Sequence, residues 1–279
     1  MKNSKVLPLL ACVGVILSSS MVNCNQKTSI SDDTEYLNAA AQAAETLGNF
    51  KSDPSYVKVL EHTTYEDGKR YLGFIKKEYP NVFKRISSLK INDKVGAPAL
   101  YQYSGIGQIS PSTLRYAKIA GDLERFFPRL NGKKILEIGG GYGGQALVLN
   151  KLFNVPLYQL IDLDSPLKLQ SAYLKRFNVV HKIIATDKLH DVEDYDLLIS
   201  NYAFSECSRS IQEEYLSKVI SKAKFGYMIC NQISHLFSIN NLDQTQLVER
   251  LKSLGFSVTI LDEDPLTFEG NYLLVFTKL

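Results

Sequence analysis

The stretch ILEIGGGYGGQAL, residues 135–147, decides the fold of this chain. An apolar, β-branched run is followed by five glycines in six positions, residues 139–144, and then by a segment of helical composition. Glycine adopts left-handed backbone conformations freely and lets other groups come close to the main chain. The stretch therefore predicts a buried strand, a tight turn, and a helix whose N-terminus faces a ligand or a packed neighbour.

Two glycine patterns fit the same letters. Gly139, Gly141 and Gly144 match G-x-G-x-x-G, the fingerprint of dinucleotide-binding proteins. Glu137, with Gly139, Gly141 and Gly143, matches E-x-G-x-G-x-G, the glycine loop of S-adenosylmethionine (SAM) methyltransferases. The glycines alone do not distinguish an NAD site from a SAM site. The order of strands and helices in the rest of the chain is needed to decide between the two cofactors.

After residue 133 the sequence alternates between short apolar runs and helical patterns. This alternation predicts an α/β, Rossmann-like sheet, mostly parallel, with helices on both faces. Ligands of such sheets bind beyond the carboxyl ends of the strands. The predicted strands are residues 134–138, 157–161, 182–185, 197–200, 226–230, 257–261 and 272–277, and the predicted helices are 144–152, 167–177, 212–223 and 245–254.

Three features around this sheet favour SAM over NAD. Asp162 ends the second strand, 23 residues after Gly139, where both kinds of enzyme hold ribose hydroxyls with an acid. Glu137 occupies a position that is normally apolar in NAD fingerprints. The chain closes with a strand, a loop and a final strand, residues 255–279, as in the terminal hairpin of class I methyltransferases, whose last strand is antiparallel. The sequence therefore predicts a class I methyltransferase sheet with SAM as cofactor.

Helical patterns precede the sheet. Residues 32–109 are expected to form a helical cap followed by a Gly- and Tyr-rich loop, and the first helix is expected to be capped by Ser31 and Asp32. The SAM-binding domain, residues 110–279, is expected to open with a helix capped at Ser110 with Pro111 in its first turn.

The first 24 residues differ from the rest. Lys2 and Lys5 precede an apolar run of twelve residues, 6–17, which is short for a bilayer span and typical of a signal peptide. The segment SMVNC places Cys24 as a candidate lipidated residue, followed by a polar tether, residues 25–31. An exported or membrane-anchored protein is favoured over a cytoplasmic one, with a buried or merely anchoring helix as the alternative.

The composition and the charge of the chain limit the kinds of partner and metal site that it can have. The 279 residues carry a net charge of +3 with both signs dispersed, so nucleic acid is not indicated as a partner. Outside the leader only Cys207 and Cys230 remain, and two cysteines make neither a disulfide framework nor a zinc site. Both are expected to be buried as small apolar residues.

Nearly two-thirds of the chain resembles a family of bacterial sugar O-methyltransferases. The resemblance covers residues 101–279 and rests on LYQYSGIGQISPSTLRYAKIAGDLERF, ILEIGGGYGGQ, LIDLDSPLKLQSAYL and YDLLISNYAFSEC, in that order. It implies SAM-dependent methyl transfer to a hydroxyl of a sugar or a similar small polar acceptor. The sequence DLDSP departs from the family's usual Asp-Leu-Pro-Glu run, so Asp164 could share the role of Asp162.

The expected cofactor site collects residues from the ends of four strands. Asp162 should accept the ribose hydroxyls, and Glu137 should anchor the amino-acid end of SAM unless it pairs with Lys133 or Lys134. Asp187 lies where this fold usually meets the adenine amino group, although an exposed loop acid is an open alternative. The full set of predicted cofactor residues is Glu137, Gly139, Gly141, Gly143, Asp162, Asp187 and Asn201.

Methyl transfer to an alcohol needs a positioned base, because the hydroxyl is a weak nucleophile. Glu206 and His235 follow the fourth and fifth strands and are the candidates, while His235 could equally be a structural hydrogen-bonding residue. No carboxylate cluster for a metal can be assembled from the sequence. Two alternatives stay open: a methyltransferase for another small molecule, such as a phenol, and an exported protein that keeps the fold without catalysis.

Overall fold

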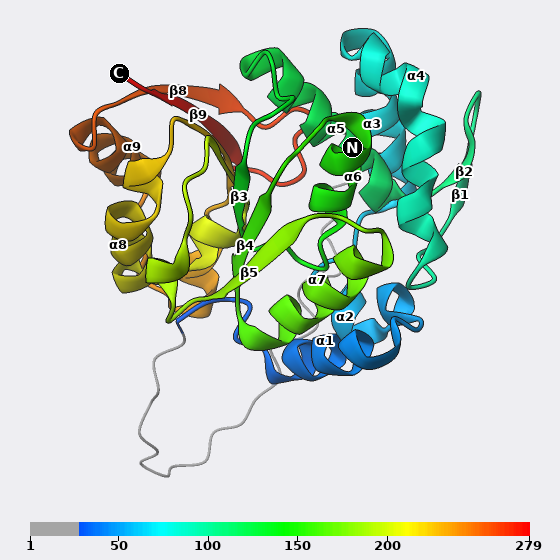
Figure 1. Cartoon of the computed structure of the whole chain (residues 1–279), viewed down its shortest axis with the longest axis horizontal. Helices are drawn as coiled ribbons and strands as arrows, with labels where there is room; N and C mark the ends of the chain where they lie inside the picture. Colours follow the sequence, from blue (N-terminus) through cyan, green and yellow to red (C-terminus); the bar gives the residue numbers. More distant parts are fainter. Residues whose placement is uncertain (1–27) are drawn as a thin grey trace, which may run out of the picture.

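The computed structural model describes residues 28–279, and the leader with Cys24 lies outside them. Its centre is a seven-stranded sheet with helices on both faces (Figure 1). The strand order is β5-β4-β3-β6-β7-β9-β8. The strands are β3 Ile135–Ile138, β4 Tyr158–Asp162, β5 His181–Ala185, β6 Leu197–Asn201, β7 Phe225–Cys230, β8 Phe256–Asp262 and β9 Tyr272–Lys278.

The direction of the strands fixes where a ligand can bind. Strands β5, β4, β3, β6 and β7 pair in parallel, whereas β9 runs antiparallel to both β7 and β8. The chain leaves β3 toward β4 on one side and later returns to β6 on the other, so the order reverses at β3. Such a switch point opens a crevice at the carboxyl ends of the strands. The glycine run follows β3 at that edge.

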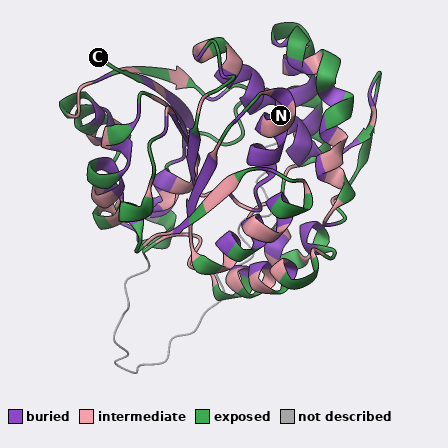
Figure 2. Ribbon diagram, in the orientation of Figure 1, coloured by how far each residue is buried: buried purple, intermediate pink, exposed green. Residues whose placement is uncertain are grey.

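Alternate residues of the sheet face two hydrophobic clusters, as the period of a strand requires. One cluster joins Ile135, Leu160 and Leu197 to helices from the N-terminal segment and to the helices after β3 and β4. The other joins Leu136, Leu198 and Met228 to the C-terminal helices. Strand β3 is buried from end to end, and β7 is buried except at Phe225 (Figure 2). The helices are α1 Thr34–Thr46, α2 Pro54–Val57, α3 Tyr65–Glu78, α4 Pro80–Leu89, α5 Pro111–Phe126, α6 Gly144–Leu152, α7 Asp164–Arg176, α8 Arg209–Lys218 and α9 Gln244–Ser253.

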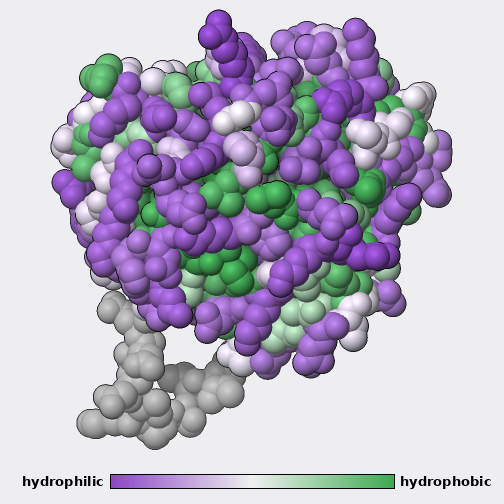
Figure 3. All heavy atoms as spheres, in the orientation of Figure 1, coloured by the Kyte–Doolittle hydropathy of each residue, from purple (hydrophilic) through white to green (hydrophobic). Residues whose placement is uncertain are grey.

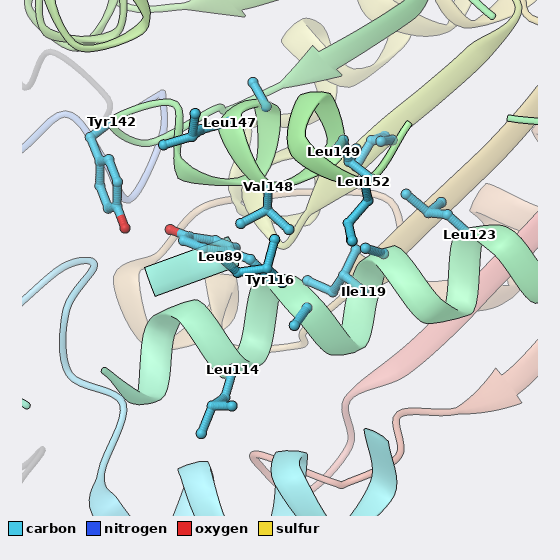
Figure 4. Packing of buried hydrophobic residues seen from close by; sticks show 14 of the residues in the cluster. Leu89, Leu114, Tyr116, Ile119, Leu123, Tyr142, Leu147, Val148, Leu149 and Leu152 are labelled. Atoms are coloured by element: carbon cyan, nitrogen blue, oxygen red, sulfur yellow. The ribbon is translucent and has the colours of Figure 1, made fainter. Parts of the chain in front are cut away.

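The N-terminal helices do not form a core of their own. Tyr36 of α1, Tyr71 of α3 and Val82 of α4 belong to the same cluster as Val148 of α6 and Tyr173 of α7. Figure 4 shows part of this packing, in which α5 and α6 interleave Leu and Ile side chains. The helical cap is therefore continuous with one face of the sheet.

The predicted strands and the four predicted helices after residue 133 are present, most with small shifts at their ends, but α8 ends at Lys218, five residues before its predicted end, and a short 3-10 segment follows. Two expectations were wrong. Asp33, one residue after the predicted caps, accepts hydrogen bonds from the first turn of α1, because its side chain reaches the amides of Glu35 and Tyr36. The Gly- and Tyr-rich loop contains a two-stranded hairpin, β1 Tyr101–Tyr103 and β2 Gly107–Ile109, in which Gly107 has a φ of 76°.

The surface of the face shown in Figure 3 is mostly hydrophilic, with apolar residues gathered near its middle. Edge strand β5 exposes Ile183 to 40%. Within residues 28–279 no helix is both long enough and apolar enough to cross a membrane.

Candidate cofactor and acceptor site

The glycine run forms the turn between β3 and α6. Gly139 and Gly141 have φ values of 77° and 58°, in the left-handed region that favours glycine. The Gly139 amide donates to the Ile161 carbonyl at 2.9 Å, which joins the turn to β4. A Cβ at Gly139 would lie 2.0 Å from the Cβ of Ala203, so a neighbouring loop already packs against this backbone.

Gly143 and Gly141 differ in what they face. Gly143, with a φ of 94°, is the N-cap of α6, and a Cβ there would lie 3.0 Å from Leu174. A Cβ at Gly141 would meet only Leu60, at 3.4 Å, an ordinary contact with a flexible side chain of the N-terminal segment. Gly141 is therefore the glycine whose exposed side faces only the flexible side chain of Leu60, which a ligand could displace.

Asp162 ends β4 beside this turn. Its carboxylate accepts from the Leu163 amide at 2.9 Å and from Nε2 of Gln170 at 2.7 Å. Burial raises the pKa of Asp162 to about 6, against hydrogen bonds from Leu163, Gln170 and the Gly140 backbone that lower it. Nε2 of Gln170 also donates to the Gly141 carbonyl at 3.0 Å, so the acid and the glycine turn are held as one unit.

Glu137 lies inside β3 and is 2% exposed. Its carboxyl group accepts from the Tyr158 hydroxyl at 2.7 Å and from Nδ2 of Asn201 at 3.2 Å, rather than from Lys133 or Lys134. Burial raises the pKa of Glu137 to about 8, although both hydrogen bonds lower it. The carboxyl group is thus held largely protonated at neutral pH.

Asn201 and Tyr202 end β6 at the switch point. Oδ1 of Asn201 is buried and has no hydrogen-bond partner among the described residues, an arrangement that costs free energy unless a donor arrives. Tyr202 has a φ of 72°, an uncommon conformation for a large side chain and one that is often found at functional sites. Its hydroxyl donates to Glu263.

A cavity of about 300 Å³ adjoins the end of β4 and the loop after β5. Asp187, exposed in that loop, faces this cavity together with the residues that follow Asp162. Helix α1 contributes one apolar wall. The lining residues are Leu37, Leu163, Asp164, Ser165, Thr186 and Asp187.

The two predicted bases lie beyond β6 and β7. Oε1 of Glu206 accepts from Nδ2 of Asn231 at 2.6 Å, and burial raises the pKa of Glu206 while this hydrogen bond lowers it. His235 belongs to the short 3-10 segment Ser234–Phe237, and its side chain lies outside the described part of the structure. That Glu206 and His235 reach the same spot therefore stays a prediction.

The N-terminal segment takes part in the site, which the sequence analysis missed. The Ile30 amide donates to the Glu206 carbonyl at 3.3 Å, and the Ser208 amide donates to the Thr28 carbonyl at 2.8 Å, so the end of the predicted tether lies along this edge. Burial raises the pKa of Tyr36, and Asp162, Tyr116 and Glu206 raise it further. No motif marks these residues, and the amphipathic pattern of α1 indicates burial without naming the partner.

Cys207 and Cys230 are buried thiols, as expected. Within residues 28–279, no group of three or more His, Cys, Asp and Glu side chains is placed to hold a metal ion.

The strand order with a reversed β9 is the arrangement of class I methyltransferases, so the predicted fold class is confirmed. No protein-family model and no curated protein matches the chain. Among solved structures, PH1948 of Pyrococcus horikoshii, whose proposed activity is RNA methylation, is 16% identical, with a TM-score of 0.49 over 70% of this chain and 99% of that chain.

Two further solved structures are similar at a lower level. Magnesium protoporphyrin IX methyltransferase of Synechocystis PCC 6803, with S-adenosylhomocysteine (SAH) bound, is 13% identical, with a TM-score of 0.47 over 76% of this chain and 100% of that chain. Precorrin-6y C5,15-methyltransferase of Geobacter metallireducens GS-15 is 15% identical, with a TM-score of 0.43 over 58% of this chain and 89% of that chain.

Proposed function

We propose that this protein is a SAM-dependent methyltransferase. The observation that carries the proposal is the unit formed by Asp162, Gln170 and the Gly141 carbonyl. It fixes a carboxylate at the end of β4 against a left-handed glycine turn at the end of β3, which is the pair of groups that a nucleoside cofactor needs at a switch point.

The residues of the crevice suit the parts of SAM in turn. Asp162 would accept the ribose hydroxyls, and the cavity bounded by Leu37 and Asp187 would take the adenine. The unpartnered Oδ1 of Asn201 would accept from the ammonium group, with Glu137 behind it. These assignments support SAM because its ribose hydroxyls and its ammonium group each find a hydrogen-bond acceptor in the crevice.

We propose that the acceptor is a hydroxyl of a sugar or of a similar small polar molecule. The cofactor supplies an electrophilic sulfonium methyl group, which becomes a methyl ether on the acceptor oxygen while the sulfonium becomes a thioether and the hydroxyl proton is released. Glu206 or His235 would receive that proton. A buried carboxylate with a raised pKa, such as that of Glu206, is a stronger base than an exposed one.

Calorimetry with the purified chain tests the cofactor. SAH should bind at one site with a dissociation constant of about 1–100 μM, and NAD should show no binding at the same concentrations. NAD binding that is tighter than SAH binding, or an absence of SAH binding, would contradict the proposal.

Turnover tests the base. In a methyl-transfer assay against a panel of sugars, loss of the correct base by Glu206→Gln or His235→Gln should lower the rate by about 10²–10⁴-fold and leave SAH affinity nearly unchanged. If neither variant affects the rate, the proton goes to another group.

We also propose that residues 1–24 direct export and that Cys24 becomes the lipidated first residue of the mature chain. Mass spectrometry of the native protein should find a membrane-associated chain that begins at Cys24. An intact Met1 on a protein recovered from the cytosol would overturn this assignment.

A further inference from the structure

A cation without an ionic partner lies beside the proposed cofactor site. Arg115 is on α5, and among the side chains that the structure describes no carboxylate oxygen comes within 4.0 Å of its guanidinium nitrogens. Its charge and its proximity lower the pKa of the neighbouring Tyr116 hydroxyl, against the larger effect of burial. An arginine surrounded by protein normally finds a carboxylate or phosphate that matches its planar fork.

An acceptor oxygen without a donor lies close to the same face of α5. Ser112 is three residues before Arg115, so both side chains project from one side of the helix. The Ser112 hydroxyl donates to Oε2 of Glu61 at 2.9 Å, whereas Oε1 of Glu61 is buried and has no hydrogen-bond partner among the described residues. Leaving such an oxygen unpaired costs free energy that a ligand hydroxyl would recover.

The electrostatic environment keeps the guanidinium charged. Burial alone would lower the pKa of Arg115, but three phenols and Glu61 together raise it above its ordinary value. The phenols are Tyr116, Tyr71 and Tyr202. The guanidinium carbon is 5.5 Å from the centre of the Tyr116 ring, which Figure 4 shows on α5 with its hydroxyl turned toward that of Tyr142 in the glycine turn.

Arg115 and Glu61 lie next to the glycine turn, because Leu60, the residue before Glu61, faces Gly141, and the ring of Tyr116 packs edge-on against Tyr142. Tyr202 directly follows Asn201, whose Oδ1 is proposed to bind the ammonium group of SAM, and its strained backbone turns the phenol toward Glu263. Tyr202 also raises the pKa of Arg115, in keeping with a guanidinium on the side of the crevice that faces the end of β6.

We propose that Arg115 and Glu61 bind an acceptor that carries an anionic group together with a hydroxyl, such as a sugar acid or a sugar phosphate. Arg115 pairs with the carboxylate or phosphate, and Oε1 of Glu61 accepts from the hydroxyl. The inference rests on the proposed function, because the methyl donor defines which side of the crevice receives the acceptor. A purely structural Arg–Glu pair would close to within ion-pair distance, and this one does not.

Ligand binding measured without turnover tests the inference. The full chain, saturated with SAH, is titrated with D-glucuronate, D-glucose 6-phosphate and D-glucose by calorimetry. At least one of the two anions should bind ten times or more tightly than glucose, since a charge-assisted hydrogen bond contributes more than a neutral one. The two anions separate a carboxylate from a phosphate as the recognised group.

Substitutions of arginine test whether Arg115 is the residue that causes the preference for the anion. Arg115→Gln should bind the anion and glucose within about twofold of each other, and Arg115→Lys should retain part of the preference because it keeps the charge without the fork. Arg250→Gln is the matched control, because Arg250 pairs with Glu213 on the surface, and it should bind like the parent. Thermal melts and SAH affinity of each variant confirm that it is folded and that the cofactor site is intact.

The binding results distinguish a failure of this inference from a failure of the proposed function. Equal binding of glucose and both anions, no binding of either anion, or an unchanged preference in Arg115→Gln overturns the inference while SAH still binds. If SAH itself does not bind to the parent protein, the proposed function fails, and the acceptor assignment fails with it.

Discussion

Replacing Glu137 with Gln should change how stability depends on pH. Glu137 is buried in the middle of β3, and burial raises its pKa from 4.5 to about 8. The folded protein therefore keeps a proton on this carboxyl group over a pH range in which the unfolded chain has lost it. Glutamine has nearly the same shape, can accept the hydrogen bond from Tyr158, and does not titrate.

The size of the effect follows from the two pKa values. Because the folded-state pKa is the higher one, the contribution of Glu137 to stability is fully present below pH 4.5 and is lost as pH rises through 8. Each pH unit in this window costs about 1.4 kcal/mol, so the 3.5 units from 4.5 to 8 amount to about 5 kcal/mol. At pH 7 the parent has lost about 3.4 kcal/mol that the Gln variant does not lose.

Urea unfolding followed by circular dichroism at pH 5, 6, 7 and 8 measures this difference. Other titrating groups cancel between parent and Glu137→Gln, so the stability of the variant relative to the parent should rise by about 1.4 kcal/mol per unit. Glu269→Gln, at an exposed carboxylate in the loop between β8 and β9, serves as the matched control and should run parallel to the parent. A constant difference between the parent and Glu137→Gln would show that Glu137 is ionised equally in both states and would refute the reasoning.

The same substitution bears on the cofactor. An ammonium group held at Asn201 would favour the ionised form of Glu137, which accepts from the same amide. Binding of SAH near pH 7 should then release up to one proton, seen as a dependence of the calorimetric enthalpy on the buffer. The Gln variant should show no such dependence.

Three further substitutions should act as follows. Asp162→Asn should weaken SAH binding about ten- to a hundredfold in calorimetry, whereas Asp164→Asn should change it by less than about threefold; equal effects would move the ribose acceptor to Asp164. Gly139→Ala should cost about 2–4 kcal/mol in urea unfolding because of its left-handed backbone and its 2.0 Å contact, while Gly73→Ala, with nothing within 4 Å in α3, should stabilise by about 0.5–1 kcal/mol. Leu37→Ala should weaken SAH binding by about 1–2 kcal/mol, and unchanged affinity would remove α1 from the adenine site.

The sheet could be predicted because the residues that define each strand are close together in the sequence. The central strands are short apolar runs, bounded by turn residues, whose side chains alternate between two buried clusters. The position of Asp162 followed from its spacing after Gly139, since the end of the second strand must lie beside the first glycine turn in a parallel sheet. Local patterns and the rules of chain topology were sufficient for these elements.

The environment of Glu137 could not be read in the same way. Its partners, Tyr158 and Asn201, lie in two different neighbouring strands, and their hydroxyl and amide reach it only in the folded register. Lys133 and Lys134, the alternative partners, precede the strand, whereas every side chain of β3 itself is buried. Because both faces of β3 are covered, either direction of the side chain buries this carboxyl group, and its partners come from the neighbouring strands rather than from the lysines.

The contribution of the N-terminal segment was hidden for a related reason. The spacing of apolar residues in α1 predicts that one face is buried, but it carries no information about which surface covers that face. The structure places Leu37 at the proposed adenine cavity and Leu60 over Gly141, so two apolar side chains from outside the sheet bound the cofactor crevice. Arg115 and Glu61 repeat this arrangement on the acceptor side, since Glu61 also comes from the N-terminal segment. The sheet supplies the polar groups common to nucleoside sites, and the segments before it supply the walls that would distinguish one acceptor from another. Selectivity should therefore change with substitutions before residue 116, and cofactor affinity mainly with those after it, apart from Leu37 and Leu60, which bound the cofactor crevice.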